Sequence, residues 1–354
     1  MDKQIDRHMD RLRVGVVGLG HNGCSFASGY QQSDQAELVA LCDLSPERIQ
    51  MAIEHASADE HVGRYTRLEE MLEAEKLDVL SVHTPDHLHA EPFCMGLQAG
   101  CHVLVEKPMG NTMDDLVQMT QAAANSSQQK TMVGHILRFN PFFAEVHRLC
   151  AAGELGEIFY LTADYIHHLK YQGDDERINP HIGSINWYLE HEKVLVGGGV
   201  HQFDLLRWYC GSNAVEVMGY GNSIAFPEMK QPDCMTAVFR MASGAVARVT
   251  GAYGIVGPRP RHCNLEVYGT EGTVRDGKVI RGTGHDQVTI EDISDRAIDG
   301  HPYEPEIEHF LDCIIQDKPT LVDAFEGASS AVATILAVEA IMTGEPQAVP
   351  RFAS

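Results

Sequence analysis

Three glycines near the amino terminus have the spacing of a phosphate-binding loop. Gly18, Gly20 and Gly23 form the pattern G-x-G-x-x-G directly after a predicted strand and at the start of a predicted helix. The first glycine allows a tight turn, the second lets a pyrophosphate approach the backbone, and the third lets the helix pack closely. The pattern predicts that a dinucleotide contacts the loop residues Gly18, Leu19, Gly20, His21, Asn22 and Gly23.

A carboxylate follows where a ribose would need one. Asp43 ends the second predicted strand, 20 residues after Gly23, and can accept hydrogen bonds from the adenosine ribose hydroxyls. Its charge would repel a 2′-phosphate, so Asp43 favours NAD over NADP. The alternative interpretation is a glycine-rich turn in an unrelated α/β protein.

Further polar residues follow two other predicted strands. Lys107 comes directly after the strand 102–106. The turn Thr84-Pro85 follows the strand 78–83. Open α/β sheets bind ligands at the carboxyl ends of their strands, so we expect Lys107 to face a ligand.

The elements that position these residues alternate between strand and helix up to about residue 132. This alternation is typical of a parallel sheet covered on both faces. The expected strands are 13–17, 37–42, 78–83, 102–106 and 131–134. The expected helices are 22–31, one capped by Ser45 with Pro46 at its first position, 85–99 and 112–125.

The pattern changes after residue 140. A helix is expected at 141–152, and extended runs lie at 158–166, 214–220, 234–241, 245–252 and 263–268. Nearby glycine-containing turns indicate an antiparallel sheet. We therefore predict an α/β protein with a Rossmann dinucleotide-binding domain at 1–132. An α+β domain with a large, mostly antiparallel sheet is expected at 133–354.

Composition excludes several classes of partner. The 354 residues include 27 basic and 50 acidic side chains, a formal net charge of −23. This charge would repel nucleic acid and anionic membrane surfaces. We find no secretory signal and no uncharged apolar window near the length of a membrane span. The nine cysteines are scattered and never form C-x-x-C, as expected for reduced thiols in a cytoplasmic protein.

Four stretches, together with the glycine loop, resemble the Gfo/Idh/MocA family, named for glucose-fructose oxidoreductase, inositol dehydrogenase and a rhizopine-catabolism protein. They are TPDHLHAEPFCMGLQAGCHVLVEKPM (84–109), GHILRFNPFFAEVHRLCAAGELGEI (134–158), GGGVHQFDLLRW (197–208) and YGTEGTV (268–274). The resemblance implies an NAD-dependent dehydrogenase that oxidises a secondary alcohol of a sugar, inositol or related polyol. It also implies that the second domain binds substrate and assembles a homodimer or homotetramer.

The resemblance assigns roles to individual residues. Lys107 and His201 would be catalytic, with Lys107 beside the nicotinamide and the reacting hydroxyl and His201 as acid/base. The cofactor would also contact Thr84, Pro85, His89 and Glu106. The substrate would contact Lys107, Arg138, Tyr165, His167, Trp187, Tyr188, His201 and Asp204.

Several of these residues also have a structural interpretation. Lys107 can instead be a strand-end charge, and His201 can be a structural histidine at a glycine-rich helix start. Arg138 can instead bridge the domains. Asp204 can instead be a helix-start carboxylate or support the site from outside it.

The chain departs from the family pattern at two positions. Gly197 stands four residues before His201, where the family usually has an aspartate. Without that carboxylate His201 would be a weaker base, and Lys107 or a nearby acidic group would share its task. The candidates closest in sequence are Glu190 and His191. Tyr188 replaces an arginine that many relatives carry after the tryptophan.

Alternatives to a simple dehydrogenase are redox-assisted glycosidase or epimerase chemistry, in which NAD is reduced and regenerated, and a non-catalytic NAD-binding sensor. A metal site is not expected. His83, His87 and His89 lie close in sequence, but Pro85 interrupts their spacing across a strand end and a helix start.

Overall fold

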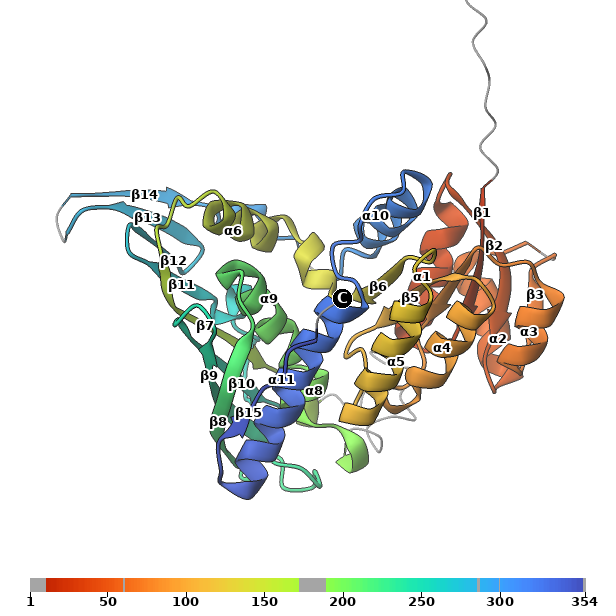
Figure 1. Ribbon diagram of the computed structural model, residues 1–354. Coiled ribbons are helices and arrows are strands. Elements are labelled where there is room, and N and C mark those ends of the chain that lie inside the picture. The colour runs from red at the N-terminus through yellow and green to blue at the C-terminus, as the bar shows by residue number, and fades with distance from the viewer. Residues whose placement is uncertain (1–10, 60, 172–188, 285–286, 299, 353–354) are drawn as a thin grey trace, which may run out of the picture.

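The computed structural model describes residues 11–59, 61–171, 189–284, 287–298 and 300–352. They form two units, each built on one sheet, and the long helix α11 (Ala324–Thr343) lies between them (Figure 1). The first unit has a parallel sheet covered by helices, and the second has a mixed sheet with helices on one side. The predicted fold class is confirmed.

The first sheet has six parallel strands in the order β3-β2-β1-β4-β5-β6. Its strands are β1 (Leu12–Val17), β2 (Ala36–Cys42), β3 (Gly63–Tyr65), β4 (Val79–Val82), β5 (His102–Glu106) and β6 (Thr131–Gly134). The winding reverses between β1 and β4, and the carboxyl ends of the strands at such a switch point form a ligand-binding crevice. The glycine loop, the Thr84 turn and Lys107 all follow strands at this end of the sheet.

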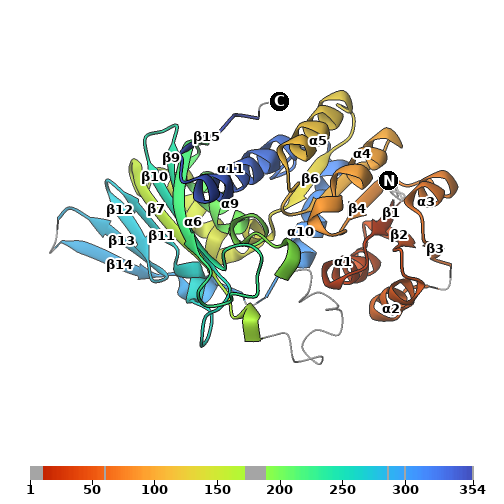
Figure 2. The same cartoon turned by 90° about the horizontal axis from the view of Figure 1, so that it is seen from below.

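Helices cover both faces of this sheet. Figure 2 shows α1 and α2 on one face and α4 and α5 on the other. The helices are α1 (His21–Gln32), α2 (Pro46–Ala56), α3 (Leu68–Ala74), α4 (Ala90–Gln98) and α5 (Met113–Asn125). The predicted cap of α2 is confirmed, because the Ser45 side chain accepts a hydrogen bond from the Arg48 N–H and Pro46 opens the helix.

The helix expected at 85–99 is shorter than predicted. A 3-10 turn, η1 (Asp86–Leu88), comes first, and α4 begins only at Ala90. Pro85 has an extended backbone, with φ −55° and ψ 144°. The His89 ring bonds to backbone carbonyls on two neighbouring turns. These contacts hold the segment as a turn, so the apolar periodicity that predicted a longer helix applies only from Ala90.

The second sheet has nine strands in the order β14-β13-β12-β11-β7-β10-β9-β8-β15, antiparallel except for the pair β7 and β10. The strands are β7 (Ile158–Ile166), β8 (Ala214–Asn222), β9 (Cys234–Met241), β10 (Val246–Ala252), β11 (Glu266–Gly269), β12 (Gly272–Arg275), β13 (Lys278–Gly282), β14 (Val288–Asp292) and β15 (Gln347–Ala348). Alternate residues of β9 and β10 are buried, so one face of the sheet belongs to the core.

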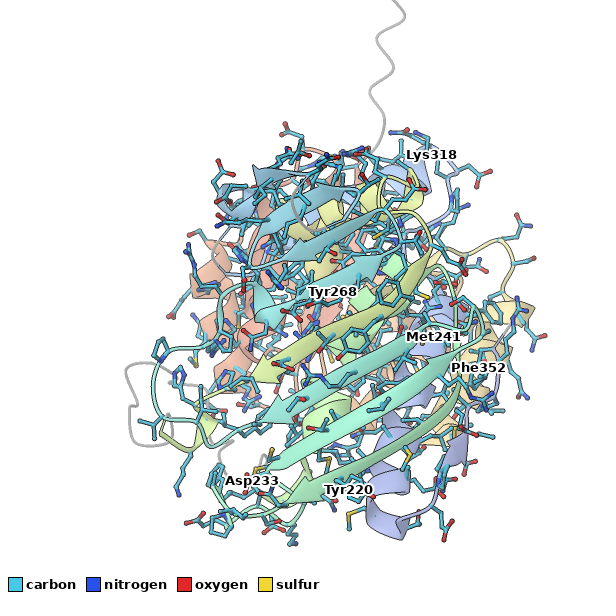
Figure 3. All side chains as sticks on the ribbon, turned by 90° about the vertical axis from the view of Figure 1, so that its left-hand side faces the viewer. Tyr220, Asp233, Met241, Tyr268, Lys318 and Phe352 are labelled. Carbon is cyan, nitrogen blue, oxygen red and sulfur yellow. The ribbon has the colours of Figure 1, made fainter. Side chains whose placement is uncertain are left out.

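Within the described ranges, the helices that pack on this sheet lie on its inner face. They are α6 (Pro141–Ala151), α8 (Val194–Gly197), α9 (Val200–Cys210) and α11. Figure 3 shows the other face, where Tyr268 and its neighbouring strands carry no covering helix. The short 3-10 turns are η2 (Ile136–Phe139), η3 (Leu169–Tyr171), η4 (Arg261–Asn264) and η5 (Ser294–Arg296).

The strand expected at 263–268 is partly wrong. Residues 261–264 form η4, and β11 begins only at Glu266. His262, Cys263 and Asn264 have positive φ values of 48°, 55° and 48°. A left-handed backbone cannot continue a pleated strand, so the apolar character of Cys263 gave a misleading signal.

The second half of the chain returns to the first unit. Helix α10 (Tyr303–Ile315) packs against α1, and its Ile307, Phe310 and Leu311 belong to the same apolar core as β1 and β2. The first sheet ends with β6 at Gly134. The division of the chain at residue 132 stays a prediction, and in space α10 belongs with the first sheet.

One helix passes the length and composition test for a membrane span. Over the described residues, α11 is long and apolar enough to cross a bilayer, with a mean hydropathy of 1.4. This helix does not contradict the expectation that no uncharged window of this length exists, because α11 contains Glu326 and Glu339. In the structure 67% of this window is buried within the protein, where α11 packs against α5, α9 and β8. Its apolar sequence is accounted for by this position between the two units.

Candidate active site

The glycine loop has the geometry that the spacing predicts. Gly18 has φ +86°, and a Cβ there would lie 2.5 Å from the backbone of His83. A Cβ on Gly23 would lie 1.9 Å from the Gly18 carbonyl oxygen, so α1 packs directly on the loop. Gly20 has no atom within 4 Å of its Cβ position. The loop is therefore crowded on its protein side and open at Gly20, where the amino end of α1 presents N–H groups to an anion.

Asp43 holds this loop from the carboxyl end of β2. Its carboxylate accepts hydrogen bonds from the backbone N–H of Leu19 at 2.8 Å and of Ser45 at 2.9 Å. The side chain is half-buried, and a carboxylate has acceptor sites beyond these two. The residues fit a dinucleotide whose ribose hydroxyls bond to Asp43 and whose pyrophosphate lies over Gly20.

Two residues from the second half of the chain reach the same loop. The Tyr303 hydroxyl, at the start of α10, donates to Asn22 Oδ1 at 3.0 Å, and its ring lies edge-on to Phe26 at 5.4 Å. The His301 ring lies 5.7 Å from Tyr303. Neither residue could be predicted from the sequence, because no local pattern shows that α10 returns to α1.

His89 joins the two turns that follow β4 and β5. Its Nδ1 lies 2.8 Å from the Pro108 carbonyl oxygen and its Nε2 lies 2.9 Å from the Thr84 carbonyl oxygen. The side chain is fully buried. Because both ring nitrogens already face protein carbonyls, His89 positions the Thr84-Pro85 turn beside Lys107. Its predicted direct contact with the cofactor stays a prediction.

Glu106 is a buried carboxylate. It faces His83 Nδ1 at 3.7 Å and accepts the Lys107 N–H at 3.2 Å. Burial alone would raise the pKa of Glu106, but His83 and Lys107 outweigh burial and lower it. Burial lowers the pKa of His83 despite the opposing effect of Glu106. The pair therefore keeps one negative charge buried at the carboxyl end of β5, beside Lys107.

Lys107 connects the two units. Its Nζ donates to the carbonyl oxygen of Gly197, at the end of α8, at 2.9 Å. Burial disfavours the ammonium, but nearby acidic groups, led by Asp86, outweigh it and raise the pKa of Lys107. Lys107 is thus a charged hydrogen-bond donor at the carboxyl end of β5, facing the second unit.

His201 lies in the first turn of α9, close to Lys107. Its ring stacks on Tyr165 at 6.3 Å and meets His135 edge-on at 6.5 Å. Within the described residues His201 Nδ1 is buried and has no hydrogen-bond partner. Burial, followed by the charge of Lys107, holds the pKa of His201 well below its ordinary value. The imidazole is therefore neutral at neutral pH.

Tyr165 and His167 extend from β7 into the same cluster. Tyr165 lies in the strand and His167 directly follows it, and their rings stack at 5.9 Å on one face. Tyr253, which directly follows β10, lies edge-on to Tyr165 at 5.9 Å. Burial lowers the pKa of His167 to about 3. The cluster offers neutral rings and hydroxyls beside the Lys107 ammonium group, and the charge of Arg259 also acts on His167.

Arg138 and Asp204 contact each other. Two guanidinium nitrogens of Arg138 donate to the two carboxylate oxygens of Asp204 at 2.7 and 2.8 Å. Ser330 also donates to Asp204, and the guanidinium lies 4.9 Å from the centre of the Trp208 ring. Both side chains are almost fully buried. This geometry favours the bridging interpretation of Arg138 and the supporting one of Asp204, and their contact with substrate stays a prediction.

A buried acid that sequence analysis did not select lies beside Lys107. Glu192 is 4% exposed, and its carboxyl accepts a hydrogen bond from the Tyr253 hydroxyl at 2.5 Å. The two candidates named from the sequence lie elsewhere. Glu190 pairs with Lys230 and is 48% exposed, and the His191 ring stacks on His87 at 5.9 Å. The signal was available in the acidic residues preceding Gly197, but spacing alone does not distinguish the buried Glu192 from the exposed Glu190.

Two predicted substrate residues, Trp187 and Tyr188, lie outside the described residues. Among the residues that are described, no group of three or more histidine, cysteine or acidic side chains is arranged to hold a metal ion.

Two family models match the chain. The model described as "Oxidoreductase family, NAD-binding Rossmann fold" matches residues 12–135. The model described as "GFO/IDH/MocA C-terminal domain" matches residues 143–275. The first covers the glycine loop, Asp43 and Lys107, and the second covers Glu192 and His201.

Individual relatives agree with these models. The scyllo-inositol 2-dehydrogenase (NAD(+)) of Bacillus subtilis (strain 168) is 25% identical over 361 residues, covering 95% of this chain and 96% of that protein. Inositol 2-dehydrogenase of Corynebacterium glutamicum (strain R) is 25% identical over 242 residues, or 67% of this chain and 66% of that protein.

The fold matches a solved structure along nearly its whole length. Scyllo-inositol dehydrogenase from Lactobacillus casei, with bound cofactor NAD(H) and scyllo-inositol, superposes with a TM-score of 0.78 at 17% identity. The match covers 96% of this chain and 99% of that one. With the two family models and the glycine loop, it follows that the chain belongs to the GFO/IDH/MocA family of NAD-binding oxidoreductases.

Proposed function

We propose that this protein transfers a hydride between NAD and a secondary alcohol of an inositol, a sugar or a related polyol. The observation that carries the proposal is the contact of Lys107 Nζ with the Gly197 carbonyl oxygen at 2.9 Å. It places an ammonium group where the dinucleotide-binding end of the first sheet meets the aromatic cluster of the second unit. A hydroxyl bound there can receive a hydrogen bond from Lys107.

The residues of the site divide the chemistry between them. NAD, when bound, supplies the hydride acceptor. Gly20 and Asp43 hold the pyrophosphate and ribose. Lys107 orients the substrate hydroxyl and stabilises the negative charge that grows on its oxygen as the carbon–hydrogen bond breaks. His201 is neutral and can accept the hydroxyl proton, so carbonyl product, hydride and proton are all accounted for.

The residues that line the site around Lys107 favour an uncharged substrate. Tyr165, His167 and Tyr253 present rings and hydroxyls, which suit the hydroxyl groups and carbon faces of a polyol. The −23 net charge opposes the approach of a phosphorylated sugar. The two curated relatives described above are both named as inositol dehydrogenases.

A panel of inositols and sugars incubated with NAD⁺ tests this proposal through NADH absorbance. We expect at least one polyol to yield NADH. Lys107→Met should lower kcat/KM by about 10²–10⁴-fold, the usual effect of a positioned proton donor or acceptor. It should leave NAD binding, followed by fluorescence quenching, unchanged.

Lys130→Met is the matched control for this variant. Lys130 precedes β6 at the opposite end of the sheet and pairs with Asp317 at 2.6 Å, so its loss should leave turnover unchanged. Turnover without net NADH would instead favour the glycosidase or epimerase alternative. NAD binding with no polyol turned over would favour a sensor.

We also propose that the protein works in the cytoplasm as a homodimer or homotetramer. All nine cysteines are free thiols, which suits a reducing compartment. The uncovered outer face of the second sheet is the surface through which copies would pair (Figure 3).

A further inference from the structure

Gly197 leaves a space that a carboxyl group fills. A Cβ on this residue would lie 2.1 Å from Glu192 Oε1 and 2.5 Å from Glu192 Oε2. The backbone of Gly197 is not left-handed, so any residue could adopt its conformation. Glycine is needed here only for close approach: the Glu192 carboxyl lies where a side chain at position 197 would begin.

The Glu192 carboxyl is held in this place from two sides. The Tyr253 hydroxyl donates to Oε1 at 2.5 Å, and Glu192 is itself 4% exposed. Val194, which begins α8 two residues later, is fully buried and packs against β10. A long side chain placed in this way has little freedom to move out of the site.

Lys107 reaches the same glycine from the other unit. Its Nζ bonds to the Gly197 carbonyl oxygen, while the Glu192 carboxyl occupies the Cβ side of Gly197. The two groups are close enough that each alters the pKa of the other. A buried acid and a half-buried base therefore converge on one residue at the junction between the units.

We propose that Glu192 is the acidic positioning residue of the Lys107 site. Its carboxyl occupies the volume that a side chain at position 197 would fill, and from there it holds the Lys107 ammonium in place for the substrate hydroxyl. This inference rests on the proposed dehydrogenase function. This role of Glu192 also explains why the site can have Gly197 where the family usually has an aspartate. The carboxyl group then comes from Glu192, five residues earlier in the chain.

The carboxyl group of Glu192 also makes the site sensitive to pH. Burial, together with the charge of Asp86, raises the pKa of Glu192 to about 8, although Tyr253 and Lys107 oppose the shift. The charged or titratable groups that face it are Asp86, Lys107, Tyr165 and Tyr253. Above that pH the carboxylate forms and attracts the ammonium, so polyol oxidation should rise through this range.

A carboxyl exchange between positions 192 and 197 tests the inference. Glu192→Ala should lower kcat by about 10²-fold, the lower end of the range for a positioned acid or base. Gly197→Asp alone should lower Tm by about 5 °C, because its Cβ meets the Glu192 carboxyl. In the double variant Glu192→Ala/Gly197→Asp, the aspartate enters the vacated space. Its kcat should return to within about tenfold of the parent, and its Tm should exceed that of Gly197→Asp.

Two further measurements separate positioning from a structural role. Glu192→Gln keeps the shape of the side chain but cannot ionise, so the rise of kcat/KM near pH 8 should disappear while Tm is retained. Glu190→Ala is the matched control, because Glu190 pairs with Lys230 at the surface. It should leave kcat, Tm and the pH profile unchanged.

The outcomes decide the inference. The inference is supported if kcat is restored in the double variant and if the rise of kcat/KM near pH 8 is lost in Glu192→Gln. The inference is overturned if the parent is active but kcat is not restored in the double variant, or if the rise of kcat/KM near pH 8 is unchanged in Glu192→Gln. Either result leaves the dehydrogenase function standing. A parent that oxidises no polyol contradicts the proposed function and, with it, this role of Glu192.

Discussion

The role of each side chain around Lys107 depends on which groups its polar atoms contact. Lys107 and His201 lie where the sequence motifs predict, because short spacings place both at the ends of elements. His89 and the Arg138 and Asp204 pair instead have their polar atoms occupied by other protein groups. A motif selects residue types near a site, but only the packed structure shows which of them have atoms left for a ligand.

Substitution of Arg138 tests this distinction. Arg138→Met leaves the Asp204 carboxylate buried without its partner, so we expect the free energy of unfolding to fall by about 3–5 kcal/mol. Urea denaturation measures this loss. The KM for the polyol should stay the same. A KM raised many-fold with unchanged stability would show instead that Arg138 binds substrate.

The missed residues share one property, which is that distant segments bring them to the site. Glu192, Tyr253 and Tyr303 come from three parts of the chain and meet the two predicted motifs only after folding. The glycine loop, Asp43 and Lys107 were predictable because each motif is local. No spacing rule connects Tyr253 to Glu192, 61 residues away.

At the scale of elements, the parallel sheet was the easiest part to predict. Its strands are apolar runs between helices, and both faces are buried, so the pattern is strong. The short β3 and α3 were missed, as were α10 and α11, although Gly300 and Pro302 stand just before α10 and Pro319 stands shortly before α11. Extended runs and glycine-containing turns predicted the second sheet, while the left-handed residues of η4 interrupted the last of these runs.

Helix α10 carries an unusual buried acid that predicts how this element responds to pH. Glu306 is 0% exposed, and within the described residues neither carboxylate oxygen has a hydrogen-bond partner. Burial, followed by the charge of Glu106, holds the pKa of Glu306 well above its ordinary value. The folded state therefore binds a proton that the unfolded state releases above about pH 4.3, and stability falls as pH rises from there.

Replacing this acid should stabilise the docking of α10 on α1. Glu306→Gln removes the ionisable group, so we expect the free energy of unfolding at pH 8 to rise by about 1–3 kcal/mol. The gain should shrink at pH 5, where the penalty is smaller. Glu304→Gln, on the same turn but exposed, should change little at either pH. A loss of stability at both pH values would show that Glu306 is ionised and paired.

At the scale of the whole molecule, the outer face of the second sheet is the surface on which assembly would depend. Val238 and Val246, on the neighbouring strands β9 and β10, are 39% and 41% exposed on this face. Charges introduced there would oppose pairing of two sheets, since they would be buried without partners.

We expect Val238→Asp/Val246→Asp to shift the particle toward the monomer mass in light scattering. Met342→Asp, on α11 away from the outer face, should leave the mass unchanged. A parent that is already monomeric, or a double variant with unchanged mass, would contradict assembly through this face.

In the proposed function, the first unit holds NAD and the second unit holds a polyol, with Lys107 between them. Incubation with NAD⁺ and inositol deuterated at every carbon tests this most directly, with the reduced cofactor analysed by NMR. We expect NADH carrying one deuterium at the nicotinamide C4 and an equal amount of inosose. NADH without deuterium, or no NADH from any such polyol, would contradict it.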